Sequence, residues 1–414
     1  MYGETVLNKS INRFIKLYPW YTGFSSDLLF YIAIDTLFLT IVKNFSAAEI
    51  VSLASLSQLA CIVLQFPLLF IIKKIGNTAS IRWGALLMLL SAVFITFGQS
   101  YYIVLIGRIL HDASVIMRNA TVVALENVLD AADRRDDFVR IRTAGNTVYA
   151  VITMLISFVA SYMFNLDNYL PMICCILACA IGFLLTLFMR DSSEYNKIAY
   201  VKKEKVKVKI RYDKIIILAI VLYALFYSVV TNGQSEGKLF IQQEVNLIFD
   251  NDNTSLIIGA IVCVSRIVRV VSNLIFAKLY KKYSSKVGVA LPVLLALSIG
   301  LIMFGSFIPA IVVKILVMGM GYTVILFIRD PFKLYVQDVV LESTPKEQHQ
   351  TLVTVLEFGV KIATAGTGLV FSAILLAYPL AVILAIMFVI AIIEIILGVI
   401  LYRAILSGRA LAEN

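Results

Sequence analysis

The chain has little of what a soluble enzyme or a nucleic-acid-binding protein needs. Charged residues make up 15% of its 414 positions, and it holds two histidines, two tryptophans and eight prolines. A soluble domain of this size needs far more polar surface to cover its core, so an ordinary soluble fold is excluded. The net charge of +10 does not by itself indicate a nucleic-acid partner, because charge must first be located along the chain.

The residue groups that carry covalent chemistry are also missing. All five cysteines lie inside apolar runs, and Cys174, Cys175 and Cys179 have no histidine or carboxylate beside them, which favours core packing over a metal or redox site. There is no Gly-rich phosphate loop and no Walker-type lysine motif, which argues against ATP-driven transport by this chain alone. No nucleophile is paired with a base. We therefore predict no enzyme activity, no metal and no cofactor.

Apolar residues, by contrast, make up 60% of the chain and are grouped in long runs. About 20 helical residues cross a hydrocarbon core about 30 Å thick, and runs of this length recur from end to end. The sequence therefore predicts an all-α polytopic membrane protein. Its twelve predicted spans lie at about 21–43, 47–72, 79–99, 101–127, 143–164, 168–189, 214–236, 254–279, 286–307, 309–336, 351–374 and 377–402.

Basic residues are concentrated in alternate connections between these spans. The basic clusters lie in residues 1–20, 73–82, 134–142 and 278–286. The other connections offer little beyond Lys43 and Lys238. Because positively charged loops stay in the cytoplasm, both termini are predicted to be cytoplasmic, in a plasma (inner) membrane. Residues 1–20 lack the apolar core of a signal peptide and are expected to form a basic amphipathic segment on the membrane surface.

The longest polar interval, residues 190–213, lies at the midpoint of the chain and includes VKKEKVKVKIRY. Its basic residues suit anionic headgroups of the inner leaflet better than nucleic acid, since a cytoplasmic segment next to a membrane needs no other partner. The predicted regions are an N-terminal segment at 1–20, six-helix bundles at 21–189 and 214–402 joined by this linker, and a cytoplasmic tail at 403–414.

An internal repeat supports two related halves. At a shift of about 211 residues, Arg118 aligns with Arg329 and Asn119 aligns with Asp330. Other aligned pairs are Glu126 with Gln337, Asn127 with Asp338, Arg135 with Lys346 and Thr143 with Thr354. Two membrane-embedded halves in the same order are typical of transporters built from parallel repeats.

Six spans, a basic linker and six more spans resemble the major facilitator superfamily. GRILHDASVIMRNA in the fourth span resembles the family's Arg-x-x-Gln-Gly motif, with Arg108 on the arginine, His111 on the glutamine and Asp112 where the family has glycine. FPLLFIIKKIGNTASIR resembles a worn Gly-x-x-x-Asp-Arg-x-Gly loop in which Lys74 and Gly76 match. The resemblance implies two bundles that work by alternating access, and Asp112 puts the family's close helix packing at that position in doubt. The fifth span lacks proline, which argues against the family's drug/proton antiporters.

Several charged residues fall near the middle of predicted spans, where each costs about 2.5 kcal/mol or more and must face protein or water. The resembled fold places them in or beside one central cavity. Arg266 and Arg269 share a helix face, and guanidinium groups suit carboxylate and phosphate, so we predict an anionic substrate or substrate group. Interhelical salt bridges are the alternative role for any one of them. The substrate-binding candidates are Arg108, Arg266, Arg269, Lys361, Tyr31, Tyr227, Asn232 and Gln234.

Proton coupling and gating are assigned to two further sets. Asp35 stands alone in the apolar run LLFYIAIDTLFLTIV, where it could bind the coupling proton or make a structural hydrogen bond. His111 could relay a proton or be simply hydrogen-bonded. The proton-coupling candidates are Asp35, His111, Asp112 and Glu357. The gating candidates, toward the cytoplasmic ends of spans four and ten, are Arg118, Glu126, Arg329, Asp330 and Lys333.

Two interpretations of span seven stay open. Its polar residues could supply neutral contacts to the substrate, or the helix could be interrupted near Gly233 and Gly237 as part of the outer gate. The polar residues are Thr231, Asn232, Gln234 and Glu236, with Tyr223 and Tyr227.

These observations predict a proton-coupled secondary transporter of a small polar, anionic solute that acts as a monomer. The alternatives are an exporter or flippase of an amphiphile, such as a drug or lipid precursor, and a non-transporting membrane receptor or scaffold. A scaffold gains nothing from a costly cationic core, which favours transport.

Overall fold

The computed structural model of the chain describes residues 2–190, 214–344 and 349–412, and every regular element in these ranges is helical. Within them, ten helical segments are long and apolar enough to cross a membrane, and residues 31–42 form a shorter apolar one. The predicted all-helical membrane fold is confirmed. The count of twelve spans stays a prediction, and the predicted linker lies outside the described residues after Arg190.

Packing divides the described residues into two compact units. Unit 1 comprises residues 2–38 and 60–190, and unit 2 comprises residues 39–59, 214–344 and 349–412. The two halves of the chain separate within the predicted linker. The end of the first predicted span and the first half of the second, however, pack with unit 2.

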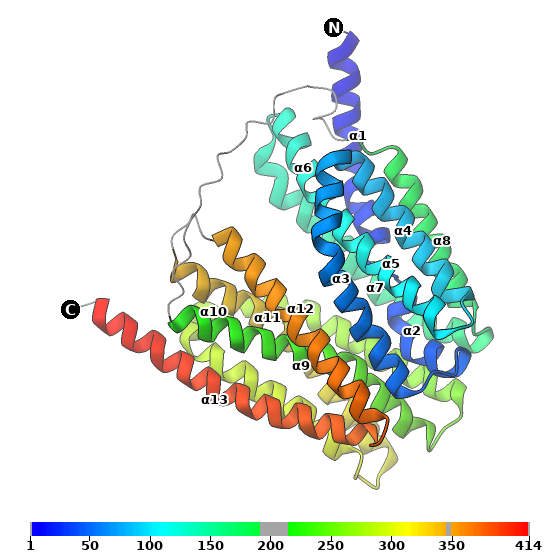
Figure 1. Cartoon of the computed structure of the whole chain (residues 1–414), viewed down its shortest axis with the longest axis vertical. Helices are drawn as coiled ribbons and strands as arrows, with labels where there is room; N and C mark the ends of the chain where they lie inside the picture. The colour runs from blue at the N-terminus through cyan, green and yellow to red at the C-terminus, as the bar shows by residue number, and fades with distance from the viewer. Residues whose placement is uncertain (1, 191–213, 345–348, 413–414) are drawn as a thin grey trace. The chain divides into compact units, whose positions relative to one another are not determined.

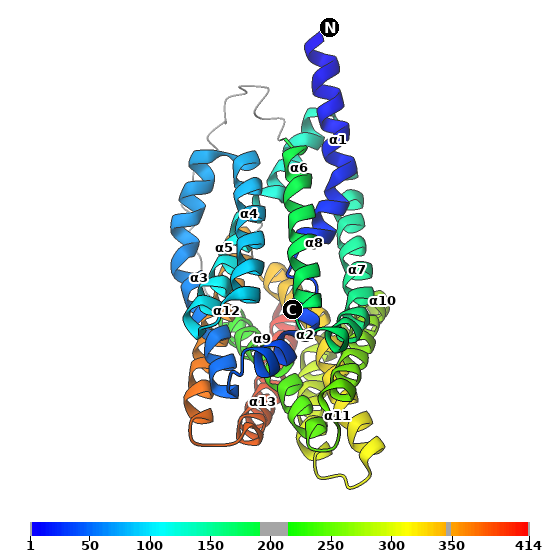
Figure 2. The ribbon, with the colours of Figure 1, turned by 90° about the vertical axis from the view of Figure 1, so that its right-hand side faces the viewer.

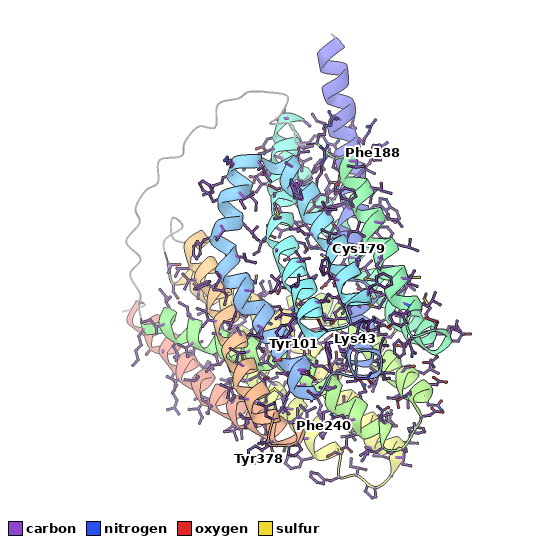
Figure 3. All side chains as sticks on the ribbon, turned by 45° about the vertical axis from the view of Figure 1, so that its right-hand side comes forward. Lys43, Tyr101, Cys179, Phe188, Phe240 and Tyr378 are labelled. Carbon is purple, nitrogen blue, oxygen red and sulfur yellow. The ribbon has the colours of Figure 1, made fainter. Side chains whose placement is uncertain are left out.

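Unit 1 contains α1 (Tyr2–Ser25), α2 (Tyr31–Leu37), the second half of α3 (Ala47–Ile75), α4 (Asn77–Phe97), α5 (Tyr101–Arg118), α6 (Ala120–Ala131), the short η2 (Arg135–Asp137), α7 (Phe138–Leu166) and α8 (Leu170–Leu187). In this unit α4 packs on both α5 and α8 (Figure 1), and α1 lies beside α7 (Figure 2). Cys175 and Cys179 are buried in α8, where Cys179 is labelled in Figure 3.

The first predicted span is not one continuous helix. α1 ends at Ser25, residues 26–30 interrupt the helix, and α2 then continues into the π-helix η1 (Phe38–Val42). α1 also buries Ile11, Phe14 and Tyr18 in the core of unit 1. The prediction of a separate surface segment was therefore wrong for these residues, because their helical spacing forms an apolar stripe that packs inside the unit.

Glycine brings α4 and α5 close together. A Cβ on Gly107 would lie 3.1 Å from the backbone nitrogen of Ile95, and a Cβ on Gly84 would lie 3.2 Å from the carbonyl oxygen of Ser114. The absence of side chains at these two positions lets the backbones approach. Close packing is thus kept although Asp112 departs from the family motif.

Unit 2 contains the first half of α3, α9 (Lys214–Asn246), α10 (Asn251–Gly305), α11 (Ile311–Glu342), α12 (His349–Leu375) and α13 (Leu380–Ala412). α9 is continuous, so the predicted interruption near Gly233 and Gly237 is wrong. Those glycines instead admit the side chains of Ile299 and Ile302 from α10. α13 continues through the predicted tail as far as Ala412. Figure 3 labels Phe240 on α9 and Tyr378 before α13.

α10 includes two predicted spans and reverses its direction. Tyr280 and Gly288 both contact α11 within residues 335–338, whereas Ile261 and Ile302 both pack on glycines in the first third of α11. The two halves of α10 therefore run antiparallel along the same neighbour. This reversal matches the two spans that the apolar runs predict.

The segment 39–59 packs on α9 and α12 within unit 2. Gln242 Nε2 of α9 donates a hydrogen bond to Thr40 Oγ1 at 2.7 Å. Ser372 Oγ of α12 donates to the Ala48 carbonyl at 3.0 Å. These two bonds join residues that are 202 and 324 positions apart in the sequence.

Candidate functional site

Unit 1 carries polar side chains around the interruption between α1 and α2. α1 ends at Ser25 with carbonyl groups that have no partner inside the helix, and the Arg118 guanidinium at the end of α5 donates to the Ser25 carbonyl. The helix dipole also favours a cation at a helix C-terminus. Arg118, a predicted gating residue, therefore joins the interrupted first span to the fourth.

His111 of α5 lies between two carboxylates. Its Nε2 is 2.9 Å from Oδ1 of Asp27, which lies in the interruption, and its Nδ1 is 3.4 Å from Oδ1 of Asp112. The second distance is that of an ion pair rather than of a short hydrogen bond. The His111 side chain is 12% exposed. An imidazole with an acidic group near each ring nitrogen can hold a proton and pass it to either carboxylate.

Arg108 adds a cation to the same region. Its guanidinium lies over the Tyr31 ring, 5.7 Å from the centroid, and Tyr31 is 2% exposed. This cation–π contact holds the guanidinium in place. Arg108 also interacts electrostatically with Asp35 and Asp112. We name Asp27, Asp35, Arg108, His111, Asp112 and Arg118 the unit 1 polar cluster.

Unit 2 has its polar residues around a proline in α11. Pro331 has no N–H, so the Phe327 carbonyl four residues earlier loses its helical partner. The Ser272 hydroxyl of α10 donates to that carbonyl at 2.6 Å. Arg269, one turn before Ser272, makes two hydrogen bonds to Asp330, at 2.7 and 2.9 Å. One neutral bond and one bidentate ion pair thus fasten α10 to α11 at the proline.

Arg329 connects the same part of α11 to α9. Its Nη1 donates to Gln234 Oε1 at 3.0 Å, and the Tyr227 hydroxyl donates to the Arg329 carbonyl at 2.6 Å. Phe226 of α9 stacks on Phe332 with ring centroids 3.7 Å apart. Tyr227, predicted to bind substrate, is therefore hydrogen-bonded to the backbone of a predicted gating residue.

Lys333 and Glu357 join α11 to α12. Lys333 Nζ lies 2.6 Å from Glu357 Oε1, and the Tyr223 hydroxyl of α9 donates to the same oxygen at 3.5 Å. The charged side chains are 40% and 43% exposed, against 33% and 24% for Arg269 and Asp330. Water therefore screens this pair more strongly. We name Gln234, Arg269, Arg329, Asp330, Lys333 and Glu357 the unit 2 ion-pair cluster.

Two predicted substrate-binding cations lie on the same helices as this cluster. Arg266 is one turn before Arg269 on α10, and its Nε has no hydrogen-bond partner among the described residues. Lys361 is one turn after Glu357 on α12 and is partly buried.

Two other predicted residues have contacts that are structural. Asn232 is 6% exposed and donates to Thr367 Oγ1 at 2.8 Å, so it binds α9 to α12. Glu126 pairs with Arg135 at 2.9 Å, and both side chains are well exposed at the end of α6. Their roles in substrate binding and gating stay predictions.

Three acidic residues were not among the predicted site residues. Asp27 stands in the short polar run between α1 and α2, and a polar interruption in an apolar span is the signal that could have found it. Glu236 of α9 is 2% exposed, and its Oε2 has no hydrogen-bond partner within the described ranges. Glu394 of α13 is fully buried, and neither of its carboxyl oxygens has such a partner there. A single acid in an apolar run is the signal for Glu394, and the polar run 231–238 is the signal for Glu236.

Comparison of the sequence with protein-family models identifies the family. A sequence model of the Major Facilitator Superfamily matches residues 20–329, which is more than half of the chain. The chain belongs to the major facilitator superfamily. This confirms the predicted resemblance and identifies the protein as a multi-pass membrane transporter. No curated protein matches the sequence.

Solved structures of superfamily members have the same fold. A mutant of the nucleoside transporter NupG is similar with a TM-score of 0.69 and 14% identity, covering 95% of this chain and 99% of that one. A bacterial homologue of the iron transporter ferroportin, in an inward-facing state, gives 0.66 and 11%, covering 95% and 98%. A mutant of the peptide transporter POT gives 0.67 and 11%, covering 96% and 94%. At these identities the similarity shows the fold alone, and the subfamily is not identified.

Proposed function

We propose that this superfamily member is a proton-coupled secondary transporter that moves a small polar solute with an anionic group by alternating access. The observation that carries the proposal is His111, held between Asp27 and Asp112 where the first span is interrupted. The bond from His111 to Asp27 joins α5 to that interruption. One proton gained or lost at this group changes the strength of the contact, and a contact that differs between two states biases their equilibrium.

The charge of unit 2 supports an anionic group on the solute. Five cations lie on α10, α11 and α12 near the proline, namely Arg266, Arg269, Arg329, Lys333 and Lys361. Two of them pair with Asp330 and Glu357, whereas Arg329 is bound to the neutral Gln234. A carboxylate or phosphate on the solute would supply further negative charge, and guanidinium forks suit both groups.

Candidate hinge positions beside the two aligned arginines support a gating role for both. Arg118 ends α5, and Asn119 separates α5 from α6. Arg329 stands two residues before Pro331 in α11. The internal repeat aligns these two positions, so we infer that both serve as hinges and that the arginines hold one of two hinge states.

The distribution of basic residues supports a proposal for the membrane and the orientation of the protein. The basic connections favour cytoplasmic termini in a plasma (inner) membrane, with anionic inner-leaflet headgroups as lipid partners. A single chain is proposed as the working unit, since one chain supplies both halves of the repeat.

Uptake into proteoliposomes tests the proposal. A panel of anionic metabolites is offered with and without an inward proton gradient, and uptake of at least one anion should rise several-fold with the gradient. Uptake that ignores the gradient for every transported anion would contradict proton coupling. Transport of lipid analogues or hydrophobic dyes with no anion uptake would favour the amphiphile exporter, and saturable binding without transport would favour the receptor.

A further inference from the structure

Unit 2 contains a pocket beside the proline of α11. The two antiparallel halves of α10 and the adjacent part of α11 enclose a cavity of about 370 Å³. Its walls come from two helices, with Phe327 and Pro331 on α11 and the others on α10: Ser272, Ile275, Phe276, Lys286, Val287, Ala290, Leu291 and Leu294. This volume is within the range of sites that hold small organic ligands, about 300 to 1,000 Å³.

The wall of this pocket is apolar except for two side chains. Phe276, Leu291 and Leu294 are typical of the rest of the wall. The first polar side chain is Ser272, whose hydroxyl hydrogen is already given to the Phe327 carbonyl. The second is Lys286, which is exposed and has no ion pair with any other residue in the described part of the chain. Lys286 is thus the group in the wall that can bind a charged ligand.

The polar and apolar parts of the pocket are ordered by depth. Lys286 begins one apolar span and Ser272 ends the preceding one, so this end of the pocket lies where the hydrocarbon begins. Leu294 is eight residues further along the helix, or about 12 Å deeper. The turn between the two halves contains Lys281 and Lys282 in the sequence, which places this end on the predicted cytoplasmic side.

We propose that this pocket binds one anionic phospholipid of the inner leaflet, with an acyl chain against Leu291 and Leu294 and the phosphate at Lys286. An apolar molecule without a charged head gains little by leaving the bilayer for such a pocket, because lipid tails are equally apolar. A phosphate beside one surface lysine, by contrast, is favoured about five-fold over a headgroup of no net charge. The order of the wall, cationic at the membrane boundary and apolar below, fits an anionic amphiphile in one orientation.

The bound lipid would contact the part of α11 that contains the proline. Phe327 and Pro331 form part of the wall, and the Phe327 carbonyl accepts the Ser272 bond. An acyl chain that fills the cavity packs against Pro331 and opposes movement of α11 at this position. An effect of this lipid on the transport rate rests on the proposed function, whereas binding of the lipid does not.

Photo-crosslinking tests the binding on its own. The full-length protein is placed in nanodiscs with equal amounts of phosphatidylglycerol and phosphatidylcholine, and a probe of either headgroup carries a diazirine on its acyl chain. We expect the phosphatidylglycerol probe to label the peptides that contain Leu291 and Leu294 about five-fold more than the phosphatidylcholine probe. Lys286→Gln should make the two probes label equally.

Two tryptophan variants separate the pocket from the general lipid surface. Ala290 lines the pocket, so Ala290→Trp should abolish the labelling, and Ala290→Leu should reduce it if the larger variant does not fold. Val293 is 44% exposed and does not line the pocket, so Val293→Trp should leave the labelling unchanged. Equal labelling by both headgroups in the unmodified protein, or equal labelling in folded Ala290→Trp and Val293→Trp, would overturn the proposal.

Discussion

The two polar clusters balance their charges in different ways. In unit 1, Asp27, Asp35 and Asp112 are three carboxylates against two arginines, and the protonation of His111 decides whether the cluster is negative or neutral. In unit 2, the described ion pairs join fixed charges, such as Arg269 with Asp330. On this difference we propose a division of labour in which unit 1 responds to protons and unit 2 binds the charge of the solute.

In the same two regions, a helix carbonyl that lacks its usual N–H donor is satisfied by different kinds of side chain. At the end of α1, the free carbonyl of Ser25 receives the charged guanidinium of Arg118. At the proline of α11, the free carbonyl of Phe327 receives the neutral hydroxyl of Ser272. A charged donor strengthens the contact but makes it depend on nearby charges, whereas a neutral donor does not. The unit 1 contact is therefore the one that a proton can influence.

The largest expected effect comes from removing the more buried ion pair of the unit 2 ion-pair cluster, Arg269 with Asp330. Arg269→Ala should lower the transport rate about 100-fold and the stability by about 2 kcal/mol, which is less than the value for a fully buried pair because both side chains keep some exposure. Transport assays and thermal unfolding in detergent measure the two effects. Exchanging the charges, with Arg269→Asp and Asp330→Arg, should restore part of the stability. No gain in the exchanged variant would mean that the pair is not the source of the loss.

A smaller effect is expected at the two aligned arginines, one in each unit. Arg329→Ala loses a bond to a neutral amide and should slow transport about ten-fold with normal folding. Arg118→Ala loses the bond to Ser25 next to the titratable group, so it should also change how the rate depends on pH. Uptake at several pH values measures both. Unchanged transport in the double variant would rule out the proposed hinges.

Ser272→Ala tests the neutral hydrogen bond from Ser272 to the Phe327 carbonyl in unit 2. It leaves the Phe327 carbonyl without a donor and should cost about 1 kcal/mol, within the range of about 0.6 to 1.7 for hydrogen bonds inside membranes. In a Pro331→Ala background, the new N–H can bond the same carbonyl, so Ser272→Ala should then cost almost nothing. Equal costs in the two backgrounds, measured by unfolding, would show that the bond does not compensate for the proline.

The smallest effect is expected at the exposed charges of unit 1. Arg135 is 71% exposed and pairs with Glu126, so Arg135→Ala should change stability by less than about 0.5 kcal/mol. It serves as the matched control for Arg269→Ala, since each removes one arginine from an ion pair. A loss as large as that of Arg269→Ala would mean that burial does not distinguish the two pairs.

Much of the fold could be predicted from the sequence because hydrocarbon thickness imposes one length on every span. The antiparallel halves of α10 and the helices α11 to α13 follow the apolar runs. The interruption at residues 26–30 was not predicted, although Asp27 marks it in the sequence, because the bond that satisfies its free carbonyl comes from Arg118 on another helix. The apolar stripe of α1 would fit the membrane surface as well as a protein core, so periodicity alone did not predict that Ile11 and Phe14 lie in the core of unit 1.

For the candidate site, residue type predicts which side chains need partners but does not identify most of those partners. A charge in an apolar run needs a partner, so Arg108, His111 and Arg269 could be chosen as candidates from the sequence. Asp112 lies on the same helix as Arg108 and His111, but the other partners lie on other segments, where spacing along one helix does not reveal them. Asp27 was missed for this reason, and the pairing of Arg269 with Asp330 required the packing of α10 on α11.

The central claim is that the proton acts at His111 and the solute elsewhere, and His111→Gln tests it most directly. Glutamine keeps a hydrogen-bonding side chain that cannot be protonated. In proteoliposomes, uptake driven by a proton gradient should fall to the rate without a gradient, while exchange of internal for external solute should keep at least about half its rate. Gradient-driven uptake that persists in His111→Gln, or loss of exchange in folded protein, would contradict the account.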